Sequence, residues 1–371
     1  MLAIGGSPGG ATPKLSLQRS CTVPRPFIRR LMASPAKSHE TSGRLFQRAT
    51  DADAVRRSVT AYEGQFAGPT ERRRENDVEL ARSYYQLVTD FYEFGWGKSF
   101  HFAPRRRGES LEGSLGRFER EIADRLELRP GMRALDVGCG VGGPMRTVAR
   151  TTGAQVVGIS IAPYHIERAT RHNVRAGLEA QCQVVEGDFN GMPFEDESFE
   201  GAFTIEACCY ATDRRRPFRE VFRVLKPGSL FVGSDWCLTS RFRPDDASHQ
   251  RIRAEIEKGN GIAALADVRE LDAALADANF DVLETRDLAL ASEIPWYQPL
   301  RASVSLRGFR NSRVGIWLTH QLVRFLEATR LSPGGTVQVH DVLRVAQSGL
   351  VQGGEAMIFT PLYFWVARKP A

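Results

Sequence analysis

The sequence predicts an α/β fold, in which a mostly parallel sheet carries helices on both of its faces. Two observations support this prediction. Short apolar segments alternate with helical segments from residue 117 to residue 235, and the first of them runs through a glycine-rich turn into a helix. In such sheets the ligand lies at the carboxyl ends of the strands, so the residues that follow strands are the first candidates for a site.

The first strand and its turn span residues 133–144 and have the sequence RALDVGCGVGGP. The strand is apolar and ends in an acid, Asp136. The glycines that follow let the backbone turn sharply and approach a ligand closely. Pro144 stands where a helix best tolerates proline, in its first turn. Together these features predict a ligand-binding loop between a strand and a helix.

Four further segments continue the alternation. The strand VVGIS ends in Ser160, and residues 184–207 contain one strand ending at Asp188 and another ending at Glu206. Residues 223–236 contain the end of a helix, a Pro-Gly turn and a fifth strand. Each of the second, third and fourth strands therefore places a polar side chain at its carboxyl end, where the ligand crevice is expected.

The C-terminal part predicts two more strands and a long insertion. Residues 280–288 predict the sixth strand and residues 357–369 the seventh, and about seventy residues separate them. An insertion of that length usually covers a site. Within it, residues 322–331 have apolar side chains at roughly helical spacing, which predicts a helix that packs into the core.

The charge of the chain argues against a nucleic-acid partner. The chain has 371 residues and a net charge of +6, but residues 1–39 hold six basic residues and no acid. The remaining body is therefore neutral, and its short arginine runs are interpreted as solvated faces. Residues 1–39 are also rich in Ser, Pro and Gly, so we interpret residues 1–45 as a disordered basic leader. A transit peptide, a flexible tail and a true start at Met32 remain open.

The sequence contains neither an apolar run long enough to span a membrane nor a zinc-binding motif. No apolar run approaches the roughly 20 residues that cross a bilayer, so any membrane contact is expected to be peripheral. Six cysteines show no C-x-x-C pair and no spacing with His that would build a zinc site, which predicts a reduced compartment and no metal. The expected location is cytoplasmic or peripheral to a membrane, the endoplasmic reticulum in a eukaryote, with organelle transit left open by the leader.

The glycine loop alone is compatible with two cofactors. Gly138, Gly140 and Gly143 fit the dinucleotide motif, whereas Gly138, Gly140 and Gly142 fit the D-x-G-x-G-x-G of S-adenosylmethionine (SAM) enzymes. A nicotinamide enzyme needs an acid at the end of the second strand, where this chain has Ser160. With G-D-F and L-K-P-G further on, the chain resembles class I SAM-dependent methyltransferases, which implies SAM as cofactor and a Rossmann-like sheet whose seventh strand is antiparallel. The cofactor-binding candidates are Asp136, Gly138, Gly140, Ser160, Asp188 and Glu206.

An aromatic segment makes the resemblance more specific. Residues 84–102, YYQLVTDFYEFGWGKSFHF, hold eight Phe, Tyr or Trp in nineteen positions, whereas the whole chain averages 9%. Together with GES, LDVGCGVGGP, IEACC, EIEKGNGI, EIPWYQPL and FTPLYFWVARKP, this segment is similar to the sterol C-24 methyltransferases from about residue 75 to the end. The resemblance implies a methyltransferase domain at 75–290, which includes the aromatic substrate segment, and a family-specific C-terminal region at 291–371, whose helical insertion covers the substrate site.

Members of that family transfer a methyl group from SAM to the Δ24 double bond of a sterol side chain in sterol biosynthesis. Attack by this weak nucleophile leaves a carbocation at C25, and a hydride shift from C24 with loss of a proton gives the 24(28)-methylene product. Each aromatic face stabilises a desolvated cation by ~0.5 to 2 kcal/mol without offering it a nucleophile. Carboxylates add electrostatic stabilisation, and one group must accept the proton.

This chemistry selects the candidates for the acceptor end of the site. The catalytic candidates are Tyr92, Glu93, Asp90 and His101, and the substrate-binding candidates are Phe91, Phe94, Trp96, Tyr210 and Trp296. Glu93 or His101 is the expected base. Packing in an ordinary core remains an alternative for Phe91 and Tyr85, and a structural role remains one for His101.

Four positions depart from the pattern of the family. The chain has Tyr210 where the family has His, Asp235 where it has Glu, Asn260 where it has Asp in G-D-G, and Ser160 where it has an Asn-rich stretch. A serine can still bind a ribose hydroxyl. The sequence does not fix which sterol is the acceptor, or whether one or two methyl groups are added.

Three other functions compete with this one. A methyltransferase of another isoprenoid, such as a prenylquinol, a tocopherol-like phenol or a linear triterpene, is the first, although a phenol needs no cation-tolerant aromatic box. A non-catalytic lipid-binding protein is expected to lose the glycine loop or Asp188, and both are present. RNA methylation conflicts with the neutral body and with the lack of an N-P-P-Y type motif. We therefore predict a hydrophobic sterol as partner and no nucleic acid; peripheral membrane contact and homo-oligomer formation stay open.

Overall fold

The computed structural model of the chain describes residues 52–301, 313–329 and 335–371. The leader expected at residues 1–45 lies outside the described residues. The chain divides into two units, Met1–Arg44 and Leu45–Ala371, and the described residues all belong to the second.

Seven strands form one sheet, in the order β3-β2-β1-β4-β5-β7-β6. Their bounds are β1 Arg133–Val137, β2 Gln155–Ser160, β3 Cys182–Glu186, β4 Phe199–Ile205, β5 Leu225–Leu238, β6 Asp281–Asp287 and β7 Phe359–Arg368. The pairs among β1 to β5 are parallel, and β7 runs antiparallel to both β5 and β6. The predicted fold class is thereby confirmed, including the antiparallel seventh strand.

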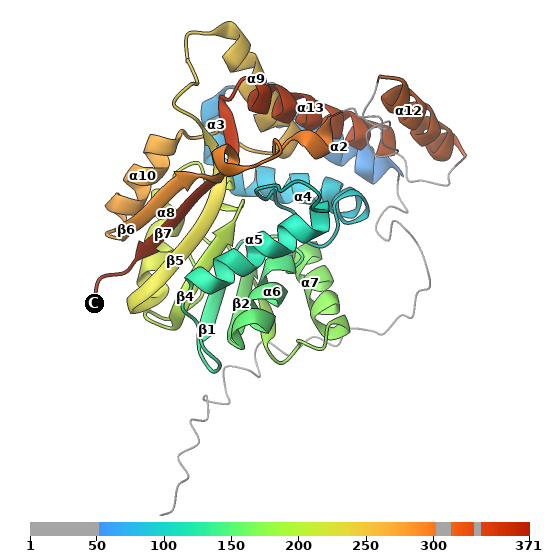
Figure 1. Ribbon diagram of the computed structural model, residues 1–371. Helices are drawn as coiled ribbons and strands as arrows, with labels where there is room; N and C mark the ends of the chain where they lie inside the picture. The colour runs from blue at the N-terminus through green and yellow to red at the C-terminus, as the bar shows by residue number, and fades with distance from the viewer. Residues whose placement is uncertain (1–51, 302–312, 330–334) are drawn as a thin grey trace, which may run out of the picture. The chain divides into compact units, whose positions relative to one another are not determined.

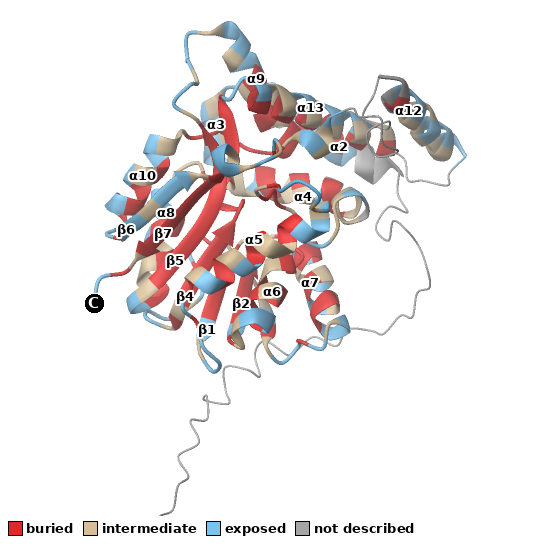
Figure 2. Ribbon diagram, viewed as in Figure 1, coloured by how far each residue is buried: buried red, intermediate tan, exposed pale blue. Residues whose placement is uncertain are grey.

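Helices cover both faces of the sheet (Figure 1). One face carries α5 (Leu111–Arg125), α6 (Gly143–Thr152) and α7 (Pro163–Arg175), and the other carries α8 (Arg215–Val224) and α10 (Val268–Asp277). Side chains of β1 alternate between the two cores, since Ala134 belongs to the apolar cluster that includes residues of α5 and α6, whereas Leu135 belongs to the one that includes residues of α8 and α10. Figure 2 shows β1, β4, β5 and β7 largely buried, whereas β6 at the edge of the sheet is mostly exposed.

A further group of helices lies at the carboxyl ends of the parallel strands (Figure 1). It consists of α2 (Ala52–Phe66), α3 (Thr70–Glu75), α4 (Asp77–Gly95), α9 (Ala247–Asn260) and α13 (Thr336–Glu355). Residues 84–95 of the aromatic segment form the second half of α4, and residues 96–102 follow it. α2, α4 and α13 share a separate apolar cluster that includes Tyr62, Tyr84 and Val342. α9 and α13 pack backbone to backbone, because a Cβ at Gly259 would lie 2.3 Å from Ala346.

Local sequence explains how the chain leaves α4 and enters α5. Gly97 has a φ of +113°, a conformation that favours glycine, and it turns the chain back beneath α4. The Oγ of Ser110, from the GES motif, accepts a hydrogen bond from the Gly113 N–H at 3.0 Å and so caps the first turn of α5. Residues 98–101 are thereby held at the strand ends.

The insertion between β6 and β7 is helical in its described part, and its expected role of covering the substrate site stays a prediction. It contains α12 (Arg313–Ala328) and α13, and α13 packs against α4. In the described part of the insertion no residue lines the pocket at the carboxyl ends of β1 to β4, and α13 shares an apolar cluster with α4. The expectation that residues 322–331 pack into the core is wrong for Leu322 and Phe325, which are 55% and 60% exposed. None of the described helices combines the length and apolarity that a bilayer span requires.

Candidate active site

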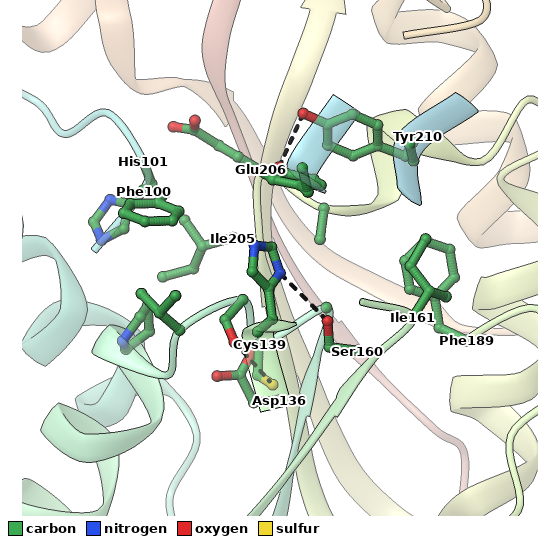
Figure 3. Close-up of a pocket in the computed structure, with 18 of the residues that line it drawn as sticks. Phe100, His101, Asp136, Cys139, Ser160, Ile161, Phe189, Ile205, Glu206 and Tyr210 are labelled. Atoms are coloured by element: carbon green, nitrogen blue, oxygen red, sulfur yellow. Dashed lines mark hydrogen bonds between the residues drawn. The ribbon is translucent and has the colours of Figure 1, made fainter. Parts of the chain in front are cut away.

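A pocket lies at the carboxyl ends of β1 to β4, beneath α4 (Figure 3). Its walls come from α4, from residues 98–101 and from the loops that follow these four strands. The side chains and backbone that line it include Ala81, Tyr85, Lys98, Phe100, His101, Asp136, Gly138, Gly140, Ser160, Ile161, His165, Asp188, Phe189, Asn190, Glu206 and Tyr210. All six residues that the sequence assigned to the cofactor are in this set, so the parallel strand ends bring them together as the fold requires.

The loop after β1 forms one end of the pocket. A Cβ at Gly138 would lie 2.3 Å from the Cβ of Ala207, so only glycine fits where this loop meets the loop after β4. A Cβ at Gly140 would meet no heavy atom within 4 Å and would occupy the open pocket. Asp136 is buried, and its Oδ2 has no hydrogen-bond partner within the described part of the chain. Burial raises the pKa of this carboxyl to about 8.

The loops after β2 and β3 extend this end. β3 ends at Glu186, two residues before the expected Asp188, so Asp188 belongs to the loop itself. Its Oδ1 accepts the Asn190 N–H at 2.8 Å, which fixes the turn. The Oδ1 of Asn190 is buried without a partner among the described residues, beside the apolar Phe189. Unsatisfied acceptors next to an open glycine loop fit a ligand that carries several hydrogen-bond donors.

Glu206 marks the opposite end of the pocket. It follows β4 with a φ of +55°, an uncommon conformation for a residue other than glycine and one associated with functional sites. Its Oε1 accepts the Phe102 N–H at 2.5 Å. Burial raises the pKa of Glu206 to about 8, although positive charge on His101 acts in the other direction. Figure 3 shows Phe100, Glu206 and Tyr210 in the upper part of the view and Asp136 and Ser160 in the lower part.

Aromatic rings line the same pocket as Glu206. The hydroxyl of Tyr85 donates to that of Tyr210 at 2.9 Å, and their ring centroids are 5.3 Å apart. Tyr85 also contacts the imidazole of His165 edge-on at 4.7 Å. Burial lowers the pKa of His165 to about 4, so this ring is neutral near pH 7. With Phe100, these groups give an aromatic wall in which Glu206 is the carboxylate.

His101 reaches the pocket, but its geometry does not suit a base. Its Nδ1 lies 2.7 Å from the Phe102 carbonyl oxygen and its Nε2 lies 3.1 Å from Oε1 of Glu119. Burial alone would lower the pKa of His101, but hydrogen bonding and charge from Glu119 outweigh it and raise the pKa. Since both acceptors call for an N–H donor, His101 is held as a cation and has no nitrogen lone pair to offer.

Asp90 and Glu93 lie away from the pocket. Glu93 pairs with Arg168 and lies 2.6 Å from Nε2 of His172, both on α7. Asp90 accepts a hydrogen bond from the Tyr164 hydroxyl and lies 3.9 Å from Arg168. Neither carboxylate lines the pocket. Their contacts instead hold α4 against α7.

Three of the aromatic residues that the sequence predicted to contact the substrate do not line the pocket. Tyr92 contacts the lining residue Phe100 edge-on, with their ring centroids 5.4 Å apart. Its hydroxyl lies 2.6 Å from that of Tyr84. Trp96 donates from Nε1 to the His101 carbonyl at 3.0 Å. Trp296 is only 4% exposed and packs in the core.

Two other aromatic candidates do not reach the lining either. Phe91 packs beside the α2, α4 and α13 cluster. The side chain of Phe94 lies outside the described residues.

Sequence reasoning did not assign Phe100, Tyr85 or His165 to the site. Phe100 lay within the quoted aromatic segment, whereas Tyr85 is 125 residues from its partner Tyr210 and no local signal joins them.

Of the four departures from the family pattern, Ser160 and Tyr210 line the pocket and the other two do not. Asp235 is buried 3.6 Å from Nε of Arg214, and Asn260 donates to the Ile256 carbonyl oxygen at 2.8 Å. The latter two therefore have structural contacts of their own.

Comparison with known proteins assigns the chain to a family. Family models described as "Methyltransferase domain" and "Sterol methyltransferase C-terminal" match residues 135–233 and 306–371. Cycloartenol-C-24-methyltransferase 1 of Oryza sativa subsp. japonica is 44% identical over 322 residues, which cover 86% of this chain and 94% of that protein. The chain belongs to the sterol C-24 methyltransferase family. Another member, the sterol 24-C-methyltransferase of Kluyveromyces lactis, is 38% identical and covers 86% of this chain and 88% of its own.

Solved structures share the fold of this family member at lower identity. The [4+2]-cyclase SpnF superimposes with a TM-score of 0.60 at 21% identity, covering 78% of this chain and 96% of that one. The cyclopropane synthase MmaA2 of Mycobacterium tuberculosis gives a TM-score of 0.60 at 15% identity, with 78% and 98% covered. A geranyl diphosphate methyltransferase in complex with SAM gives 0.54 at 17% identity, with 73% and 99% covered. These similarities confirm the class I methyltransferase fold.

Proposed function

We propose that this protein transfers a methyl group from SAM to C-24 of a Δ24 sterol side chain, as a step of sterol biosynthesis. The observation that carries the proposal is its 44% identity, over 86% of its length, to a cycloartenol-C-24-methyltransferase. The pocket supports it, because a polar glycine loop at one end faces an aromatic wall with a single carboxylate at the other. Family membership and chemistry therefore agree.

The glycine-loop end suits SAM. When bound, SAM supplies an electrophilic methyl group on a sulfonium sulfur. Asp136 offers its unpartnered Oδ2 to an amino group, and Ser160 offers a hydroxyl to a ribose. Asp188 and Asn190 supply acceptors beside the apolar ring of Phe189, as a flat heterocycle with an amino group requires.

The opposite end suits a cation on the acceptor. Phe100, Tyr85 and Tyr210 present aromatic rings that stabilise positive charge and add no strong nucleophile. The carboxylate of Glu206 supplies negative charge in a site from which water is largely excluded, where such charge is most effective. We assign to Glu206 both the stabilisation of the cation and the acceptance of the final proton, roles that the sequence had suggested for Glu93.

The test is an incubation with methyl-labelled SAM and a panel of acceptors, followed by mass spectrometry. The panel contains several Δ24 sterols, a prenylquinol, a tocopherol-like phenol and a linear triterpene. We expect one label in a 24-methylene sterol and none in the other acceptors. Labelling of a quinol or a phenol with no sterol product would overturn the proposal. The same panel also determines which sterol is preferred and whether a second methyl group is added.

Phe100 and Tyr92 allow the aromatic wall to be tested ring by ring. Phe100→Leu removes a lining ring but keeps the apolarity, so turnover should fall by ~0.5 to 2 kcal/mol, roughly 2- to 30-fold. Sterol affinity should fall less, because the cation exists only after methyl transfer begins. Tyr92→Leu should cost less turnover than Phe100→Leu, and Tyr92→Phe should cost least. A larger loss in Tyr92→Leu than in Phe100→Leu would place the cation next to Tyr92, as the sequence suggested.

A further inference from the structure

The outer face of α12 is apolar and exposed. Trp317, Leu318, Leu322 and Phe325 have 59%, 46%, 55% and 60% of their surfaces exposed. At 100° per residue these four side chains fall within an arc of about 140°, which also contains the half-buried Gln321. The other exposed large apolar residues of the described chain, such as Val174 and Val282, are not grouped on one helix. Figure 2 shows α12 with much of its surface exposed.

The opposite face of α12 is already occupied. Val323 and Leu326 are half-buried on this side, where α12 packs on α13. Glu327 accepts the N–H groups of Gly335 and Val337 at 2.9 and 3.0 Å, which satisfies the start of α13. The apolar outer face is therefore not turned toward the rest of the fold.

The charges of α12 favour one kind of partner. Glu327 is the only acid in its sequence and points to α13. The exposed Arg324 lies two turns from Trp317, on the same side of the helix. An apolar face with a Trp, a basic flank and no acid is typical of a helix that lies in a membrane interface. A protein partner would more often be met by a rim of both charges.

We propose that α12 docks this protein on the surface of a lipid bilayer. The apolar face enters the boundary between headgroups and acyl chains, and Arg324 remains at the level of the headgroups. The choice of a bilayer rests in part on the proposed function, because a sterol resides in membranes. α12 packs on α13, and α13 connects it to the helix above the pocket. Val339 and Val342 of α13 share an apolar cluster with Tyr84 and Val88 of α4.

Trp317 provides an internal probe for this docking. Of the five tryptophans, Trp236, Trp296 and Trp365 are buried and Trp96 is half-buried, so Trp317 is the exposed one. Vesicles of phosphatidylcholine alone are the probe, because they give the basic residues 1–39 little to bind. Adding them to the full chain should shift the emission of Trp317 to shorter wavelength. Trp317→Phe should lose this shift and still sediment with the vesicles.

A pair of double variants tests the surface itself. Leu322→Ser with Phe325→Ser should lower vesicle binding by about tenfold or more, because two large apolar side chains no longer enter the interface. Val174→Ser with Val282→Ser removes two exposed apolar residues elsewhere and should bind vesicles as the native chain does. Both should retain native SAM affinity and native turnover of detergent-dispersed sterol.

Each result has a distinct meaning. Equal vesicle binding by both double variants would overturn the docking proposal while sterol turnover still supports the function. Vesicle binding that depends on α12, without turnover of any sterol, would support docking and reject the function. If the α12 variant instead dissolves a dimer of the native chain and vesicles do not compete with that dimer, the face is an interface between two copies and the proposal is wrong.

Discussion

Gly140→Val is expected to lower the affinity for SAM at least ~100-fold, or about 2.7 kcal/mol, while the protein stays folded. A Cβ at this position would meet no protein atom within 4 Å, so the new side chain would enter the pocket and not the core. Gly140 has a φ of +51°, and a branched residue in this conformation costs roughly 1–2 kcal/mol. Titration calorimetry with SAM and a melting curve measure the two effects separately.

Gly177→Val is the matched control. Gly177 has a φ of +65° and also has no atom within 4 Å of an added Cβ, but it is exposed and lies outside the pocket. The melting temperature of Gly177→Val should fall by about as much as that of Gly140→Val, and the SAM affinity of Gly177→Val should stay native. Native-like SAM binding by Gly140→Val would show that the cofactor lies elsewhere. Equal loss of SAM binding in both variants would trace the effect to backbone strain alone.

The cofactor end of the site could be predicted because it depends on local sequence and one rule of topology. Asp136, Ser160 and Asp188 each lie at or just after the end of a strand that could be recognised from its apolar residues. Glu206, which the sequence also assigned to the cofactor, follows β4 but lies at the opposite end of the pocket. Once the strands are parallel, their carboxyl ends must meet at one edge of the sheet. The fold rule therefore brought together residues that lie as far as 70 positions apart in the chain.

The acceptor end could not be predicted in the same way, because it depends on which side of α4 faces the pocket. Aromatic residues are spread over about half of the circumference of this helix, so the pattern does not show which of them face the pocket. In the structure Tyr85 faces the pocket, and Glu93 and Asp90 lie about 80° and 140° around the helix from it. They meet Arg168 of α7 instead. The side chains of Glu93 and Asp90 therefore turn toward Arg168, and no sequence motif indicates that this arginine lies beside α4.

α12 shows a second limit. The apolar spacing of residues 322–331 identified a helix, and the helix is present. A helical period shows that a helix has an apolar side, but it does not show what that side contacts. Leu322 and Phe325 are exposed because α13 packs on the opposite side of α12.

Glu206→Gln is expected to lower turnover at least ~100-fold, a loss typical of removing one electrostatic stabiliser from an active site. The amide has the same size and can still accept the Phe102 N–H that holds Oε1 at 2.5 Å. Folding and sterol affinity should therefore change little, and the loss should appear in kcat. Glu93→Gln is the comparison, because Glu93 pairs with Arg168 outside the pocket. It should lower the melting temperature and cost less than about tenfold in turnover.

The pH dependence gives Glu206 a second, independent signature. Burial raises its pKa to about 8, so in the free protein the carboxylate forms only as the pH approaches that value. kcat/KM should then rise with pH and level off above about 8. The native state keeps this proton after the unfolded chain has released it, so between pH ~4.5 and 8 this group lowers stability as the pH rises.

Asp136 also has a pKa raised to about 8, and the two carboxyls can be separated by substitution. If Glu206 is the base, Glu206→Gln abolishes the rising limb of kcat/KM, whereas Glu93→Gln preserves it. A rising limb that persists in Glu206→Gln would assign it to Asp136 and to cofactor binding. If Glu93→Gln loses both the limb and more turnover than Glu206→Gln, the cation lies on the α7 side of α4. The assignment of the base from the sequence would then be right, and the one from the pocket wrong.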